Sequence, residues 1–170
     1  MQLKDSMGLW GILGVRVYDI RNGKMQLIRT FTKKNQIVND GRQAVLELLA
    51  PGGLGQADRQ LFSISAGTNN TPPTIVNTRA TMTRVWDHDF TVGEITYVAS
   101  TPNDFYVWVQ ASMPALVHPG VVFTEAGVFT RGDGVDPLTI KLYARQTHPA
   151  VTKTATMVIA YDWRFGISIQ

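Results

Sequence analysis

The chain has 170 residues, a length that suits one domain with a sizeable core, and 44% of them are apolar. Charged residues make up only 17%, below the roughly 25% of an average soluble domain, and no apolar run reaches the length of a membrane helix. The absence of cysteine excludes disulfides and thiolate metal sites, and the dispersed net charge of +3 is too small to predict a nucleic-acid surface. We therefore expect neither a membrane nor a nucleic acid as partner.

Residues 7–12, MGLWGI, form an apolar segment punctuated by glycine. Such a segment is costly to leave in water, and a chain poor in charge tolerates repeated contacts between copies. We interpret residues 1–12 as an N-terminal arm that docks on a neighbouring chain, with Trp10 as its anchor and Leu9 and Ile12 beside it. The alternative is that Trp10 packs in the core of its own chain.

Residues 13–31 predict a β-hairpin. Leu13, Val15 and the apolar residues after them alternate with polar or small residues, as in a strand with one buried face. Asn22 and Gly23 suit a two-residue turn in which both positions need a positive φ. The segment from Met25 to Phe31 supplies the second strand.

A short α-helix is predicted at about residues 40–50. Val45, Leu48 and Leu49 recur at helical spacing, and Pro51 ends the segment. The helix has one apolar face, so we expect it to lie across one sheet or to close an end of the fold.

Seven later segments have the composition of strands and are separated by Gly, Pro and Asn-rich connections. Val and Thr supply about a fifth of the chain, and both are stiff residues that pack well on a pleated sheet. The sequence therefore predicts a mostly β fold, an antiparallel β-sandwich with one short helix, in a single domain at residues 13–170. The seven segments are 61–66, 81–90, 93–99, 105–112, 121–130, 138–146 and 157–169.

Two of these strands carry aromatic residues at alternate positions. Tyr106 and Trp108 share one face of their strand, and Tyr161, Trp163 and Phe165 share one face of the last strand. A buried central strand explains such a pattern most simply. Tyr106 and Trp108 would otherwise form a platform for a sugar, or part of a subunit interface.

The sequence contains no recognisable catalytic or metal-binding set. His88 lies between Asp87 and Asp89, but alternation on a strand places the histidine and the aspartates on opposite faces. His118 and His148 each precede a proline, which favours extended loop conformations. We therefore expect no cofactor, no metal and no enzymatic activity.

Three segments together resemble a known family. They are FTKKNQIVNDGRQAVLELLA at residues 31–50, LFSISAGTNNTPPTIVNT at residues 61–78, and VVFTEAGVFT at residues 121–130 followed by LYARQTHPAVTKTATMVIAYDWRF at residues 142–165. Their order and spacing are similar to those of tail-fibre and tail-associated structural proteins of tailed bacteriophages. In this chain His148 stands where that family commonly has an apolar aromatic residue.

The resemblance implies a non-enzymatic virion structural protein in the tail, baseplate or fibre-attachment region, assembled in the host cytoplasm. Its partners would be copies of itself, as a homo-oligomer, and other virion proteins. The absence of cysteine agrees with assembly in a reducing compartment. The alternatives are a capsid decoration or head-fibre protein, a carbohydrate-binding module that uses Tyr106 and Trp108, and a hydrolase, against which the lack of an acid–base set argues.

Overall fold

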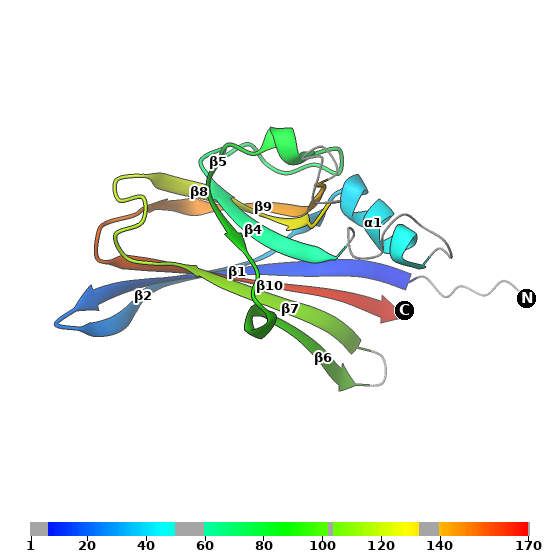
Figure 1. Ribbon diagram of the computed structural model, residues 1–170, viewed down its shortest axis with the longest axis horizontal. Helices are drawn as coiled ribbons and strands as arrows, with labels where there is room; N and C mark the ends of the chain where they lie inside the picture. Colours follow the sequence, from blue (N-terminus) through cyan, green and yellow to red (C-terminus); the bar gives the residue numbers. More distant parts are fainter. Residues whose placement is uncertain (1–6, 50–59, 102–103, 133–139, 170) are drawn as a thin grey trace, which may run out of the picture.

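The computed structural model describes residues 7–49, 60–101, 104–132 and 140–169 (Figure 1). Its strands form two five-stranded antiparallel sheets, and one short helix lies at one end of the molecule. The predicted fold class, a mostly β antiparallel sandwich with one helix, is confirmed.

The strand order is β2-β1-β10-β7-β6 in the first sheet and β3-β9-β8-β4-β5 in the second sheet. The first sheet contains β1 (Met7–Arg21), β2 (Lys24–Lys34), β6 (Ile95–Thr101), β7 (Asp104–Met113) and β10 (Met157–Ile169). The second contains β3 (Gln36–Ile37), β4 (Leu61–Gly67), β5 (Arg84–Asp89), β8 (Val122–Thr130) and β9 (Leu142–Thr152). Helix α1 spans Asn39–Leu49, and the short 3-10 helices η2 (Arg79–Thr81) and η3 (Val92–Glu94) precede β5 and β6.

The core lies between the two sheets and follows from the alternation along the strands. Leu13 and Val15 of β1 face inward with Tyr161 and Trp163 of β10, and all four are almost completely buried. The second sheet contributes Phe123 and other apolar residues to the same cluster. The three alternate aromatic residues of the last strand are thus core residues, as a central strand requires.

The predicted hairpin between β1 and β2 is confirmed. Asn22 and Gly23 have φ values of 52° and 71°, so the turn has the two left-handed residues that suit a tight connection. β1 and β2 pair over the length of the hairpin, with one register shift between Val17 and Tyr18.

Of the predicted N-terminal arm, the structure describes residues 7–12. These residues belong to β1 and pair with the end of β10, so that Trp10 lies opposite Gly166 and Ile12 opposite Arg164. β1 begins upstream of Leu13 because the long strand β10 provides backbone hydrogen-bond partners as far as Met7. Residues 1–6 lie outside the described part of the chain.

His148 also lies in a different element from the one predicted. It was expected in a loop because Pro149 follows it, but both residues are within β9. The pairing of β8 with β9 shifts register between Phe123 and Glu125, so the chain around Pro149 is irregular there. Such an irregularity accommodates a proline, which cannot donate to a regular ladder.

Helix α1 approaches the second sheet so closely that one of its positions must be glycine. A Cβ atom on Gly41 would collide with the backbone carbonyl of Tyr143 in β9. The backbone N–H of Val38 donates to that same carbonyl at 3.3 Å, which fixes the start of the helix against the sheet.

We therefore expect Gly41→Ala to destabilise the fold by about 1–3 kcal/mol, because the backbone of β9 or the helix must move to make room. This loss would occur although alanine is the better helix former. Urea denaturation measures it, with Gly93→Ala as the control because a Cβ atom there meets open space. Equal stability of the two variants would contradict the close contact.

Candidate functional site

Four residues named by the sequence analysis lie together on the outer face of the first sheet. Leu13 and Val15 point into the sandwich, so alternation places Trp10 and Ile12 of β1 on the opposite face. Tyr106 of β7 and Trp10 lie on either side of Gly166 of β10, and Trp108 and Ile12 lie on either side of Arg164. We call Trp10, Ile12, Tyr106 and Trp108 the outer aromatic patch.

The patch is held by contacts within the chain. The rings of Trp10 and Tyr106 have centroids 6.2 Å apart and are tilted by 50°. The indole of Trp10 lies over Gly166, where a Cβ atom would strike the ring. Trp10 is therefore half-buried against its own sheet with part of its surface left open. Leu9 lies on the other face of β1 by alternation and is separate from the patch, with 38% of its surface exposed.

Charged side chains lie among the aromatic residues of the patch. The guanidinium of Arg164 lies 5.7 Å from the centre of the Trp108 ring. Arg16 pairs with Asp162 at 3.3 Å on the same face. Because Arg164 lies over Trp108 and the Trp10 and Tyr106 rings are tilted, the patch is an uneven surface rather than a row of coplanar rings.

The hairpin carries a second apolar surface that the sequence analysis missed. Met25, Leu27 and Ile28 of β2 are exposed, with 57% of Met25 and 54% of Leu27 open to solvent. β2 is an edge strand of the first sheet, and its hairpin projects from one end of the molecule (Figure 1). The sequence analysis assigns Met25 to Phe31 to a strand, but nothing in the strand pattern shows that Met25 and Leu27 lie on an uncovered face.

The outer face of the second sheet carries a buried ion pair. Nε of Arg145 in β9 donates to Oε2 of Glu125 in β8 at 2.8 Å, and both side chains are inaccessible to solvent. The other carboxylate oxygen of Glu125 accepts the backbone N–H groups of Asn69 at 3.1 Å and Thr83 at 2.8 Å. Arg145 also donates to the side-chain oxygen of Asn77 at 3.1 Å.

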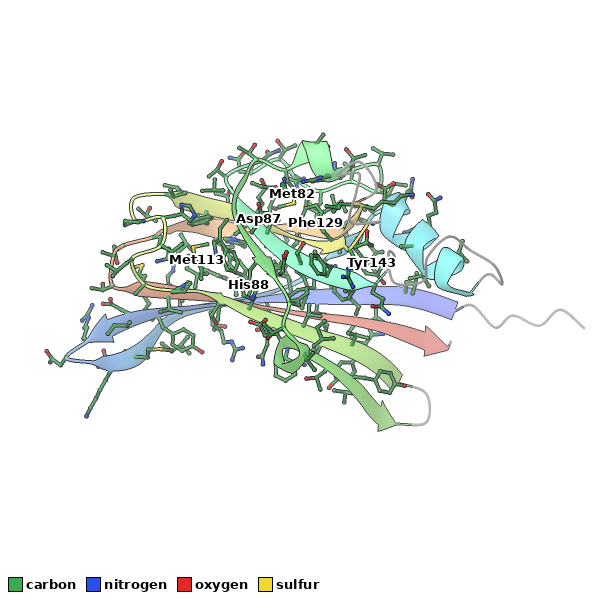
Figure 2. The ribbon with its side chains drawn as sticks, viewed as in Figure 1. Met82, Asp87, His88, Met113, Phe129 and Tyr143 are labelled. Atoms are coloured by element: carbon green, nitrogen blue, oxygen red, sulfur yellow. The ribbon has the colours of Figure 1, made fainter. Side chains whose placement is uncertain are left out.

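This ion pair fastens a long irregular segment, residues 68–83, over the second sheet. Met82 of that segment packs on Phe129 and Leu142 in a small second core on the outer side of the sheet (Figure 2). The segment and the two strands contain residues of the second and third motifs quoted above. The ion pair therefore gives several of those motif residues a structural role.

The polar residues around His88 form separate pairs. Oγ of Ser65 donates to the carboxylate of Asp87, whereas Nε2 of His88 lies 2.9 Å from the carboxylate of Glu94. The imidazole of His88 also stacks on Trp86 at 5.7 Å. Within the described residues, no group of three or more histidine and acidic side chains is placed to hold a metal ion.

The comparisons with known proteins give no relative. No family model, no curated protein and no solved structure matches this chain. In the part of the chain that the structure describes, no helix combines the length and the apolar character needed to cross a membrane.

We expect Glu125→Gln to cost about 3–5 kcal/mol of folding free energy, because the charge of Arg145 would stay buried without its counter-ion. Chemical denaturation measures the loss, and amide hydrogen exchange should rise at Asn69 and Thr83. Arg21→Gln is the control, since it removes an exposed partner of Asp19 and should cost about 0–1 kcal/mol. A small loss with unchanged exchange at both amides would contradict the proposed role of the pair.

A second prediction concerns pH. Partial burial raises the pKa of Glu94, but hydrogen bonds from the Thr91 backbone and from His88 outweigh it and hold the pKa below the usual value. A lowered carboxyl pKa gives stability that is complete above about pH 4.5 and is lost as the pH falls through the folded-state pKa. Thermal melting from pH 6 to pH 3 should therefore show a smaller decline in Tm for Glu94→Gln than for the native chain. Parallel declines would contradict this.

Proposed function

We propose that this chain is a non-enzymatic structural protein of a tailed-bacteriophage virion, in the tail, baseplate or fibre-attachment region. The observation that carries the proposal is the ordered set of motifs, whose residues Asn69, Glu125 and Arg145 meet in one hydrogen-bonded network. Proteins that share a scaffold keep the residues that hold its loops on its sheets in the same order along the chain. This supports treating the motifs as parts of one fold rather than as separate coincidences.

The contact surface that we propose is the end of the β1–β2 hairpin that carries Met25 and Leu27. The occupant is a second copy of this chain. β2 has an unpaired outer edge in the described sheet, and an edge strand with exposed apolar residues favours pairing with another chain. β10 pairs with β1 as far as Asp19, so only the tip of the hairpin, with Met25, is two-stranded, and burying it against a neighbour would stabilise it.

The location in the virion is a separate part of the proposal. Antibody labelling of imaged particles distinguishes the tail, baseplate or fibre region from the head, where a capsid decoration or head-fibre protein would lie. Labelling confined to the head would replace the tail assignment with that alternative, and a chain absent from purified particles would overturn the virion assignment.

A carbohydrate-binding module is the second candidate, because Tyr106 and Trp108 are half-exposed on the outer face of the first sheet. Aromatic rings that stack on sugars need open faces, and Arg164 lies over the ring of Trp108. Because Arg164 covers that face of the ring, the patch is better suited to packing against a protein than to stacking on a sugar. A saturable change of tryptophan fluorescence on titration with sugars would favour the module.

We predict that the native chain forms a homo-oligomer and that the double variant Met25→Glu with Leu27→Glu is a monomer. Carboxylates at these positions would repel their counterparts and would lose water on burial. Size-exclusion chromatography with light scattering measures the molar mass of each variant.

The control is Val92→Glu, which adds a carboxylate at a residue that is 94% exposed and lies away from the hairpin, on η3. It should leave both the mass and the melting temperature unchanged. A native chain that stays monomeric at tens of micromolar, or a double variant with the native mass, would refute assembly through the hairpin.

A further inference from the structure

Opposite charges gather at the two edges of the first sheet. Residues 24–34, which form edge strand β2, contain four basic residues and no acidic one. Residues 85–101, which run from β5 through η3 to edge strand β6, contain three acidic residues and neither lysine nor arginine. The basic residues are Lys24, Arg29, Lys33 and Lys34, and the acidic residues are Asp87, Asp89 and Glu94. Each edge of one copy is therefore complementary in charge to the other edge of a second copy.

The edge at β6 also carries apolar side chains that the second sheet leaves uncovered. Ile95 lies opposite Val109 of β7, which is a core residue, and Tyr97 lies on the same face of β6 two positions later. Ile95 is nevertheless 37% exposed, and Tyr97 is 67% exposed. Like the end of the β1–β2 hairpin, this edge thus combines exposed apolar surface with charge of one sign.

The acidic residues lie next to these apolar side chains. Asp87 lies 3.3 Å from the guanidinium of Arg84, and Glu94 lies 2.9 Å from Nε2 of His88. Because His88 belongs to β5, the second pair holds the end of β5, with Asp89, beside the start of β6. Asp89 is exposed and has no cationic partner among the described residues. We call Asp89, Glu94, Ile95 and Tyr97 the acidic edge.

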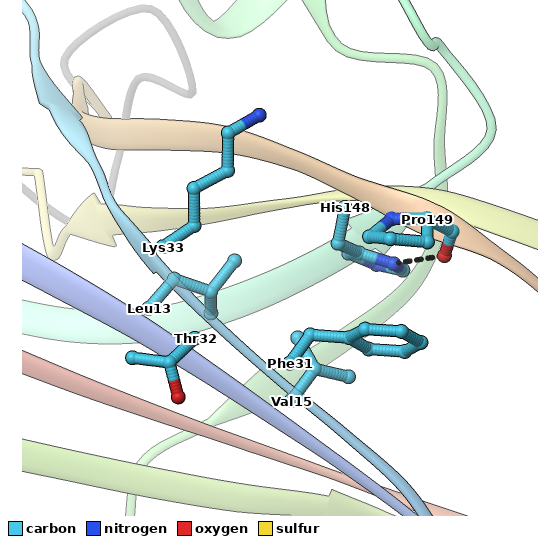
Figure 3. A pocket seen from close by; sticks show the side chains of 7 residues that line it. All are labelled: Leu13, Val15, Phe31, Thr32, Lys33, His148 and Pro149. Atoms are coloured by element: carbon cyan, nitrogen blue, oxygen red, sulfur yellow. Dashed lines mark hydrogen bonds between the residues drawn. The ribbon is translucent and has the colours of Figure 1, made fainter.

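The basic residues of β2 have no carboxylate partner in the described part of the chain. Arg29 and Lys33 donate to backbone oxygens of β9, each at 3.4 Å. Phe31 stacks on His148 of β9, with ring centroids 6.5 Å apart (Figure 3). The later half of β2 is thus occupied within the chain. The free part is the hairpin end, where Lys24 and Arg29 flank the exposed apolar residues.

Charge decides which surface of a second copy the hairpin meets. In a two-fold contact between hairpins, the basic residues of one copy would face those of the other, and like charges placed opposite each other are unfavourable. The acidic edge offers charge of the opposite sign. Four strand spacings separate β2 from β6, about 20 Å at the usual distance between strands. One copy can therefore hold a different neighbour at each edge.

We propose that copies of this chain assemble head to tail, with the hairpin end of one copy bound to the acidic edge of the next. Met25 and Leu27 pack on Ile95 and Tyr97, and the basic residues of the hairpin face the carboxylates of the edge. This inference rests on the hairpin contact of the proposed function and identifies the surface that the hairpin binds. Such a contact repeats from copy to copy, so it gives a ring when the rotation closes and a filament when it does not.

Two variants of the full chain separate the hairpin from the acidic edge. The hairpin variant is Met25→Glu with Leu27→Glu, whose carboxylates would face the carboxylates of the acidic edge. The edge variant is Tyr97→Lys, whose ammonium group would face Lys24 and Arg29. Light scattering should give each variant alone the mass of a single chain.

An equimolar mixture of the two variants is the decisive sample. The edge variant keeps an intact hairpin, and the hairpin variant keeps an intact acidic edge, so one contact can form between them. At a concentration at which the native chain is assembled, the mixture should have the mass of two chains and no larger species. A contact between two hairpins predicts instead that the edge variant alone keeps the native mass.

The matched control is Val76→Lys, which places an ammonium group at a residue that is 69% exposed and lies in the segment over the second sheet. It should keep the native mass. Val92→Glu keeps the acidic sign of the edge, so its native mass is expected in this arrangement too. Asp89→Lys is a second edge variant in case Tyr97→Lys does not fold, and it should also be a monomer that pairs with the hairpin variant.

The outcomes distinguish this inference from the proposed function. Folded edge variants with the native mass, or a mixture that stays monomeric, would overturn head-to-tail assembly. A monomeric hairpin variant would then leave the hairpin contact standing, with another partner surface. A hairpin variant with the native mass, or a native chain that is monomeric at tens of micromolar, would remove both contacts, and the virion assignment would still be decided by antibody labelling of particles.

Discussion

The ion pair between Glu125 and Arg145 is the interaction on which the outer layer of the second sheet depends. Removing two charges from water is expensive, and their attraction compensates only when every remaining polar atom finds a partner. Here the carboxylate accepts backbone N–H groups from both ends of the segment at residues 68–83, and the guanidinium bonds Asn77 between them. The segment has little regular structure to satisfy its own backbone, so the pair supplies both its partners and its position.

This arrangement makes the two sides of the sandwich unequal. The second sheet has its outer face covered by a segment of the same chain, whose Met82 packs on Phe129 of β8. The first sheet has no comparable cover among the described residues, and the outer aromatic patch and the exposed residues of β2 remain half-open to solvent. A chain with few charged residues thus keeps its apolar surface on one sheet and on the hairpin that projects from it (Figure 1). That asymmetry is the physical basis for proposing assembly through this side.

The features that could be predicted from the sequence are the local ones. The turn at Asn22 and Gly23, helix α1 and the alternation of Tyr106 with Trp108 each depend on residues a few positions apart. The ion pair could not be predicted, because Glu125 lies 20 residues from Arg145 and 56 from Asn69. Alternation also could not tell which face of an edge strand is covered, since that depends on how far the opposing sheet extends. The sequence analysis assigns Trp10 to an arm because its segment is apolar and rich in glycine; the strand partner of residues 7–12 is β10, at the other end of the chain.

Strand β2 carries the proposed contact and is also held to the second sheet. Its exposed residues Met25 and Leu27 form that contact, and Lys33 donates to the backbone oxygen of Thr147 in β9 at 3.4 Å. Arg29, between them, donates to the backbone oxygen of Ala150 at 3.4 Å. A neighbour on the hairpin would therefore meet an edge strand that two side-chain hydrogen bonds already hold to β9, so less ordering would be needed when the contact forms.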